Sequence, residues 1–334
     1  MAQAAATFDT YDSRRNREEF SNAIHMITPE ETPFMSLVGR EKVASTHPEW
    51  STDALATPVT NNAVVEGNEW VIGTIDPTVR VGNYTMISEK SYNVSRTYEK
   101  TLKAGPASEL GRQRRKKGVE LKKDMEAALL ANSASVAGSS SVARVAGGLP
   151  SWLTSNDDRG SGGSEGGFNS GTGLTVAATN GTQRAFTKTI LDNVIQLSYN
   201  SGGNGRAFMC SPYVKTVFST FMSNSNVAAF RTQMTGEKQG TIYGAADVYV
   251  SDFGAIDIIP NRVMAQVGAS IARNGFLVDP EFVSVGIFDD IQEHKVAKTS
   301  DSDKRVLNVE YTLLVKNEAA HGVAADLYGM TASS

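Results

Sequence analysis

The 334-residue chain contains very little cysteine and histidine. Its one cysteine, Cys210, excludes an intrachain disulfide framework and cysteine-based zinc sites, and its apolar neighbours Phe208 and Met209 favour a small buried side chain in a strand. The histidines are far apart and lack the local spacing of metal-ligand motifs: His25, His47, His294 and His321. The sequence therefore predicts no metal site, no cofactor, and a fold stabilised by packing alone.

Long hydrophobic runs are also missing. No stretch approaches eighteen uninterrupted apolar residues, and residues 1–6 contain no cationic region leading into an apolar segment. We therefore expect no contact with a membrane and no export. The protein should stay in the cytoplasm where it is made, or in something assembled there.

Catalytic motifs are scarce as well. The glycine-rich run 160–167 is not followed by Gly-Lys-Ser/Thr, which excludes a phosphate-binding loop, and no Gly-x-Ser-x-Gly elbow occurs. The triplet Asp252-Phe253-Gly254 matches the metal-binding triplet of protein kinases, but its companion motifs are absent, so it predicts a turn between strands. Sequence order leaves a Ser-His-Asp arrangement open. We predict that the protein is not an enzyme; a serine hydrolase using His294 or His321 is the least favoured alternative.

The charge balance is mildly acidic. The formal net charge is −4, with 40% hydrophobic and 20% charged residues, as in folded soluble chains of this length, which make about two subdomains. This balance argues against a protein whose whole surface binds nucleic acid, although a local basic segment could face phosphate.

The first 45 residues are polar and mixed in charge. They end in the run from Ile27 to Phe34, in which Pro29 and Pro33 prevent a continuous helix. We predict an extended arm anchored by an apolar cluster around Phe34. A disordered tail is the alternative.

Residues 50–98 have the pattern of strands. Tyr84, Met86, Tyr92, Val94 and Tyr98 share one parity, and turn-forming residues interrupt the segment. Residues 49–89 contain six acidic residues and one basic residue. The pattern predicts a long, projecting, acidic β-hairpin, and because an isolated two-stranded hairpin is marginal in water, it should require a partner surface.

A long basic helix follows this hairpin. Ser108 can cap the helix and Pro106 prevents it from beginning earlier. Residues 109–130 combine a narrow apolar stripe with clustered cations, among them Arg112, Arg114, Arg115 and Lys117. The sequence predicts a helix that lies across a surface.

Residues 133–182 are rich in Gly, Ser, Thr, Asn and Ala. A flexible linker and a packed insertion are both compatible with this composition. The motif from Gly148 to Leu153 interrupts it, and its Trp152 should have a docking site. An α/β region follows, in which Thr187 caps a helix, residues 207–210 form a strand, and residues 306–316 alternate as a sheet covered on one face does.

This order of arm, acidic hairpin, basic helix, glycine-rich excursion and α/β domain resembles the major capsid (major head) protein of tailed bacteriophages, with the HK97-type fold. The resemblance covers nearly the whole chain. Its landmarks are Ile27 to Phe34, Gly148 to Leu153 and Val250 to Arg262.

The resemblance implies an α+β fold and a map of domains. Roughly 186–275 would surround fivefold and sixfold axes. The map is an N-terminal arm (1–45), an extended β-hairpin loop (46–100), a spine helix of the peripheral domain (101–135), a Gly/Ser-rich insertion (136–185), an axial domain (186–275) and peripheral-domain strands (276–334).

Contacts between subunits follow from the resemblance and from the charges. The acidic hairpin of one subunit and the basic helix of the next are complementary, so Glu66 and Glu69 should meet Arg114, Arg115 or Lys117 of a neighbour. The expected contact set is Phe34, Glu66, Glu69, Trp70, Arg112, Arg114, Arg115 and Lys117.

The resemblance also implies the partners. The chain should assemble with itself into hexamers and pentamers of a closed head shell, with packaged DNA inside bound without sequence specificity. Because no lysine lies between Lys42 and Lys90, a covalent cross-link through a lysine of the hairpin is not expected. Only about 45 residues precede the hairpin, so scaffolding should be a separate protein, alongside portal and decoration proteins. The alternatives are an encapsulin-like compartment and a phage tail protein.

Overall fold

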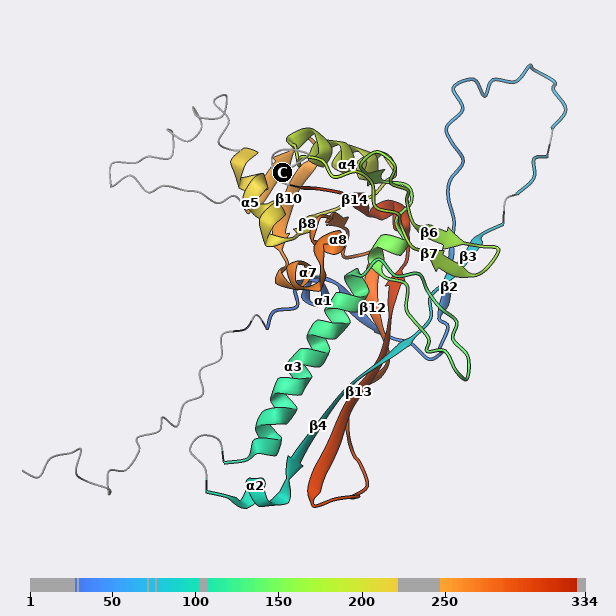
Figure 1. Cartoon of the computed structure of the whole chain (residues 1–334). Helices are drawn as coiled ribbons and strands as arrows, with labels where there is room; N and C mark the ends of the chain where they lie inside the picture. The colour runs from blue at the N-terminus through green and yellow to red at the C-terminus, as the bar shows by residue number, and fades with distance from the viewer. Residues whose placement is uncertain are drawn as a thin grey trace, which may run out of the picture.

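The computed structural model describes residues 28, 30–70, 72–75, 77–102, 107–221 and 247–328. Two β-sheets organise this part of the chain, and the long helix α3 crosses beside the smaller sheet (Figure 1). The two sheets share a continuous apolar core, in which Tyr311, Phe34 and Phe276 are fully buried. The chain therefore has the mixed α+β architecture that was predicted.

The smaller sheet has four strands in the order β1-β12-β13-β4. β12 and β13 form a long antiparallel pair, β4 pairs with β13, and β1 adds a parallel edge strand on β12. Leu307, Val309 and Tyr311 in β13 are buried and alternate with half-buried residues, as predicted for a sheet covered on one face. The prediction is wrong for the end of the strand, because residues 311–315 are all buried. The strands are β1 (Gly39–Lys42), β4 (Met86–Ser95), β12 (Val283–Lys295) and β13 (Ser302–Val315).

Helix α3 (Glu109–Leu130) packs against β4 and β13 of this sheet. The hydroxyl of Ser108 accepts a hydrogen bond from the Gly111 N–H at 3.2 Å, as the predicted cap requires. Leu121, Met125 and Leu129 form the buried stripe. The predicted basic helix is confirmed, with bounds inside the expected 101–135; residues 103–106 lie outside the described part.

The larger sheet has six strands in the order β5-β14-β11-β8-β10-β9. Helices α4 (Lys188–Asn200) and α5 (Pro212–Phe221) pack on it, and Leu191, Phe208 and Phe218 lie in its core. Thr187 caps α4 as predicted. The strands are β5 (Asp157–Asp158), β8 (Ala207–Cys210), β9 (Val248–Ser251), β10 (Gly254–Pro260), β11 (Gly275–Val278) and β14 (Gly322–Ala324). The short helices are α1 (Pro33–Leu37), α7 (Arg262–Val267) and α8 (Ala269–Ala272).

The predicted domain boundary between residues 275 and 276 does not follow the sheets. It cuts through β11, and both β11 and β14 hydrogen-bond within the larger sheet, β11 directly to β8. Hydropathy shows that these segments are strands, but strand pairing across the chain is a tertiary property. Residues 276–328 therefore divide between the two sheets.

The predicted long hairpin is also shorter than expected. Only β2 (Glu49–Thr52) and β3 (Val79–Gly82) pair with each other, and among the described residues between them there is no strand. β4 pairs with β13 of the smaller sheet. Tyr98 lies in helix α2 (Arg96–Lys100), so the predicted strand parity ends before it. The segment is a two-stranded root that carries a long loop, which we call the loop 53–78 and of which residues 53–70, 72–75 and 77–78 are described.

The glycine-rich segment is a packed insertion, and the flexible-linker alternative is wrong. It contains η1 (Leu149–Ser151) and the hairpin of β6 (Gly167–Asn169) and β7 (Leu174–Val176). Gly160 passes so close to the backbone carbonyl of Thr182 that a Cβ atom has no room.

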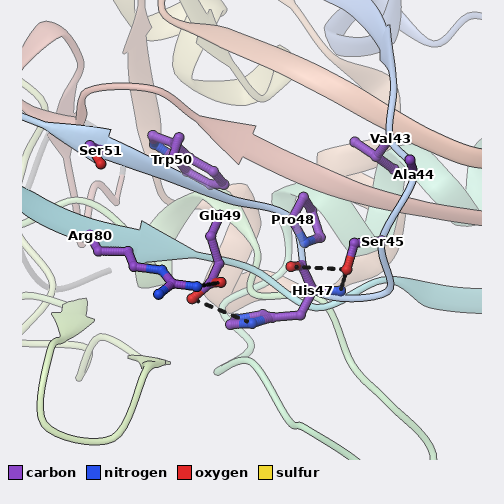
Figure 2. A pocket seen from close by; sticks show the side chains of 9 residues that line it. All are labelled: Val43, Ala44, Ser45, His47, Pro48, Glu49, Trp50, Ser51 and Arg80. Carbon is purple, nitrogen blue, oxygen red and sulfur yellow. Dashed lines mark hydrogen bonds and ion pairs between the residues drawn. The ribbon is translucent and has the colours of Figure 1, made fainter.

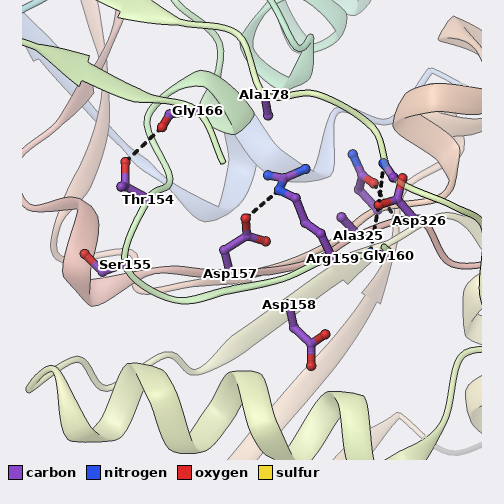
Figure 3. Close-up of polar contacts among 12 residues, drawn as sticks. Thr154, Ser155, Asp157, Asp158, Arg159, Gly160, Gly166, Ala178, Ala325 and Asp326 are labelled. Carbon is purple, nitrogen blue, oxygen red and sulfur yellow. Dashed lines mark hydrogen bonds and ion pairs between the residues drawn. The ribbon is translucent and has the colours of Figure 1, made fainter. Parts of the chain in front are cut away.

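A carboxylate from the chain's C-terminal part holds this insertion in place. Asp326 accepts hydrogen bonds from the N–H groups of Gly160 at 3.1 Å and Gly181 at 2.9 Å, and nearby Arg159 pairs with Asp157 at 2.5 Å (Figure 3). Asp326 has a φ of 60°, an unusual left-handed conformation for a residue with a side chain. The insertion is therefore tied to the end of the larger sheet.

Candidate subunit interface

The loop 53–78 projects from the rest of the molecule on its two-stranded root (Figure 1). It carries large apolar side chains that the chain's own body does not cover. Each of these seven is at least 72% exposed: Leu55, Val59, Val64, Val65, Trp70, Ile72 and Ile75. The loop also has four acidic residues and no lysine or arginine. Exposed apolar clusters of this kind mark sites of interaction.

The root of the loop is fixed by an aromatic stack. The ring of Trp50 in β2 lies 5.6 Å from Trp152 of the insertion, and Trp152 lies 5.7 Å from Phe168 in β6. Such stacks add to the free energy of area burial. The sequence predicted a docking site for Trp152. In the structure Trp152 packs between Trp50 and Phe168 and so holds the root of the loop.

Asn83 holds the other strand of the root. Its side-chain amide donates to the carbonyls of Gly147 at 3.1 Å and Leu313 at 2.8 Å, and its oxygen accepts from the Gly147 N–H at 2.8 Å. The side chain is fully buried. A projecting loop on a root fixed from both sides can present its apolar residues in a defined direction.

An open hollow of about 490 Å³ lies beside the root, lined by residues 43–45, 47–51 and Arg80 (Figure 2). Within it, Glu49 pairs with Arg80 and lies 3.8 Å from His47. His47 also stacks on Tyr84, with ring centres 4.1 Å apart. The Nε2 of His47 and the Nε1 of Trp50, both residues of the lining, have no hydrogen-bond partner among the described residues.

The arm predicted around Phe34 is anchored in the chain's own core. Phe34 is fully buried in α1, which corrects its assignment to a contact between subunits. The anchor is the carboxylate of Glu126 in α3, which accepts from the N–H groups of Phe34 at 2.7 Å and Met35 at 2.9 Å. Residues 1–27 of the predicted arm lie outside the described residues.

Glu126 also reaches the larger sheet. It accepts from the side-chain amide of Asn261 at 2.7 Å, and Asn261 caps α7 directly after β10. The carboxylate is fully buried, and this burial raises the pKa of Glu126, while its three hydrogen-bond donors oppose the rise. One side chain thus links arm, helix and larger sheet.

Most of the predicted basic contact residues of α3 have partners within the chain. Arg112 pairs with Glu109 at 2.5 Å, Arg114 with Glu293 at 3.3 Å and Lys117 with Glu120 at 2.7 Å. Arg115 is exposed, and no ion pair to it occurs in the described ranges. Of the four cations, Arg115 is therefore the one available to another molecule.

Glu293 of β12 is the acidic centre of the network that holds Arg114. It accepts from the Tyr92 hydroxyl and from Arg305 at 3.1 Å. The hydrogen bond from Tyr92 lowers the pKa of Glu293, and burial raises the pKa of Tyr92 to about 12. The carboxylate stays ionised, so Arg114 remains engaged within its own chain.

The histidines do not form a catalytic arrangement in the described part of the chain. His321 is 1% exposed, and its Nδ1 accepts from the Asp279 N–H at 3.1 Å. Burial lowers the pKa of His321 to about 4. His294 is exposed on β12. No group of three metal-binding side chains occurs within the described ranges, and no helix there is long and apolar enough to cross a membrane.

Sequence reasoning missed three residues that build this region: Asn83, Glu126 and Asp326. Each is a polar residue whose partners lie far away in the sequence, so no local pattern marks it. The exposed apolar side chains of the loop are visible in the sequence, but their pattern does not indicate an interaction site. They occur in a charged segment without the periodicity of a helix or a strand.

The two sheets, the crossing helix and the projecting loop define the class of protein. Solved structures with this fold include a chain of Gordonia phage Cozz (13% identity, TM-score 0.60, covering 97% of this chain and 96% of that chain). Others are the capsid of a native GTA particle (11%, 0.58, 96% and 98%) and the holo-SrpI encapsulin complex from Synechococcus elongatus PCC 7942 (10%, 0.56, 96% and 94%). The fold is that of the HK97-type phage capsid proteins.

The particular family follows from the sequence. The family model of the SU10 major capsid protein matches residues 3–328, and the chain belongs to this family of phage major capsid proteins. It is also similar to the major capsid protein of Escherichia phage Phieco32, with 41% identity over 127 residues. That similarity covers 38% of this chain and 36% of the relative.

Proposed function

We propose that copies of this chain assemble into the closed icosahedral head shell of a tailed bacteriophage, around double-stranded DNA and without catalysis. The observation that carries the proposal is the loop 53–78. Its seven exposed apolar side chains are not covered by the described residues of their own chain, and apolar side chains gathered on one projecting loop favour a protein partner. In a shell, neighbouring copies supply that partner.

The two sheets then have different places in the shell. The smaller sheet with α3 is the peripheral domain, and the larger sheet with α4 and α5 is the axial domain near the fivefold and sixfold axes. Hexamers and pentamers build the shell, and separate scaffolding, portal and decoration proteins complete it. Assembly takes place in the host cytoplasm, and the mature chain belongs to the virion capsid.

The loop is the contact to a neighbouring copy. Trp70, which is 95% exposed, is its aromatic anchor, and Glu66 and Glu69 form its charged rim. Of the basic residues predicted to receive these acids, Arg114 and Lys117 already pair within the chain, so the proposal now centres on Arg115. An exposed ion pair contributes about 0–1 kcal/mol, so it sets register more than affinity.

Electron microscopy of the purified protein tests this function, with the chain expressed alone and with the neighbouring phage genes. Closed shells or flat hexameric sheets are expected from the natural chain. A Trp70→Ser/Ile72→Ser variant should fold but lose these assemblies, because the replaced side chains are exposed in the subunit. Val142→Ser/Val176→Ser, at two exposed apolar sites of the glycine-rich insertion, is the matched control. A natural chain that remains monomeric in both preparations would contradict the proposal.

An encapsulin-like compartment is the second candidate, because the SrpI encapsulin complex shares the fold. Such a shell encloses protein cargo and would need a cargo-docking groove. The match to a phage capsid family along residues 3–328 favours the phage head. The nucleic acid or protein content of assembled shells separates the two candidates.

A further inference from the structure

The exposed side of α3 carries positive charges that form no ion pair with the acids of the described residues, although Asp289 and Asp290 of β12 line the same hollow as Lys122. Arg115, Lys116 and Lys122 are exposed and Lys123 is half-buried. No ion pair or side-chain hydrogen bond involves any of them within the described ranges. We call these four residues the α3 cationic face.

Helix geometry places the four head groups together. Arg115 and Lys122 are seven residues apart, as are Lys116 and Lys123, which is two helical turns or about 10 Å along the axis. All four therefore lie on one side of the helix, away from buried Leu121. The face keeps its full charge over two turns.

The neighbouring acids do not cancel this charge. Glu120 is held by Lys117 at 2.7 Å, and Asp124 is held by Lys90 at 2.6 Å. The cations that pair with these two acids, Lys117 and Lys90, do not belong to the α3 cationic face. A concentrated positive face on a chain with a net charge of −4 attracts anions locally.

The residue composition of the α3 cationic face indicates which kind of anion it binds. Protein partners bind through buried aromatic or aliphatic anchors. The apolar side chains between these cations are half-buried Val119 and Leu121, which is buried within its own chain. The phosphate backbone of a nucleic acid needs only positioned cations. The loop 53–78 has the opposite make-up, with many apolar side chains, and in the proposed contact it meets only Arg115 of this face, through Glu66 and Glu69.

We propose that the α3 cationic face binds the phosphate backbone of double-stranded DNA without sequence preference. The inference rests on the proposed function for the presence of DNA, and on the charge geometry for the binding itself. In the unassembled chain four cations give weak binding that a doubling of the salt concentration reduces about ten-fold. In a shell, where Arg115 meets the loop of a neighbouring copy, the three lysines make the contact with DNA. DNA is then held at the shell wall but remains free to move during filling.

A triple variant tests the proposal. Lys116→Gln/Lys122→Gln/Lys123→Gln removes three charges from the face and leaves Arg115 for the loop contact. The control Lys188→Gln/Lys298→Gln/Lys316→Gln removes the same net charge from sites that are already paired, with Asp192, Asp303 and Glu41. Fluorescence anisotropy with a labelled random-sequence duplex is measured for the unassembled chain over a series of NaCl concentrations.

The dependence of log affinity on log salt concentration is the readout. Its slope should become less steep by about 2.7 in the triple variant, and by less than about 1 in the control. Equal changes in the two variants would overturn the proposal, because net charge would then explain the binding. So would a triple variant that binds the duplex like the natural chain.

Shell formation by each variant is followed separately by electron microscopy. A triple variant that loses assembly but keeps its DNA binding would make the face a protein contact and overturn the proposal. A further outcome is a natural chain that forms no shells, with a salt dependence of its DNA affinity that is lost only in the triple variant. That result would support the DNA-binding face and contradict the proposed function.

Discussion

At the scale of single residues, buried polar side chains join parts of the chain that are distant in sequence. Glu126 is the strongest example, since it accepts hydrogen bonds from the arm and from the larger sheet at once. A buried carboxylate is costly unless its hydrogen bonds are satisfied. Its removal would leave several donors without partners.

We expect Glu126→Gln to lower the free energy of unfolding by about 3 kcal/mol, because an amide cannot accept from three donors that are arranged around a carboxylate. Glu120→Gln on the same helix is the control, since its half-exposed pair with Lys117 contributes about 0–1 kcal/mol. Urea unfolding of the unassembled chain measures both variants. Equal midpoints would show that Glu126 does not join these elements.

His321 makes the stability depend on pH. Its pKa is about 4 in the folded chain against an ordinary 6.5, so only the unfolded chain takes up the proton in this interval. Stability is therefore complete above pH 6.5 and falls by about 3 kcal/mol as the pH is lowered to 4.

His321→Asn, which keeps an acceptor for the Asp279 N–H and cannot become charged, should flatten this part of the stability profile. His294→Asn at an exposed site should leave its slope as in the natural chain. Urea midpoints between pH 4 and 7 provide the comparison. An unchanged slope in His321→Asn would mean that other groups cause the acid sensitivity.

At the scale of elements, the packed insertion determines where the loop root lies. Trp152 stacks between Trp50 and Phe168, so the glycine-rich segment supports a strand that precedes it by about a hundred residues. The composition of the segment alone was equally compatible with a flexible linker and with a packed insertion. The close approach at Gly160 and the hydrogen bonds to Asp326 explain why glycine is needed there.

The three tryptophans allow a direct separation of folding from assembly. Trp152→Ala should destabilise the subunit by about 3–5 kcal/mol, because it leaves a large cavity in the seat of the root. Trp70→Ala should change the subunit's stability by less than about 0.5 kcal/mol and should impair shells. Thermal unfolding and electron microscopy are compared for each variant. A stable Trp152→Ala chain would contradict the role of the stack.

At the scale of the whole molecule, charge is segregated between elements. The loop 53–78 carries acids without cations, while α3 carries an excess of cations, although the net charge is only −4. Complementary charges on two surfaces of one chain favour head-to-tail contacts between copies.

A charge exchange tests this contact in the shell. Arg115→Glu alone, or Glu66→Lys/Glu69→Lys alone, should reduce shell yield through like-charge repulsion, and their combination should restore it. Lys188→Glu, on α4 and distant from the contact, is the control for altered net charge. Assembly is quantified by sedimentation and microscopy. Normal shells from Arg115→Glu alone would refute this pairing. The apolar contact of the loop is tested separately by the Trp70 variants.

The sequence by itself determined the α+β class, the capped basic helix, the helix capped by Thr187 and the resemblance to phage capsid proteins. Each of these depends on local chemistry: a capping hydroxyl, a hydrophobic period, a proline or a run of charge. Only the tertiary structure decided that β11 and β14 belong to the larger sheet, that Phe34 is internal and that Arg112, Arg114 and Lys117 of α3 pair within the chain. Strand pairing, burial and ion pairs join residues up to hundreds of positions apart, and no local pattern in a single sequence records such partners.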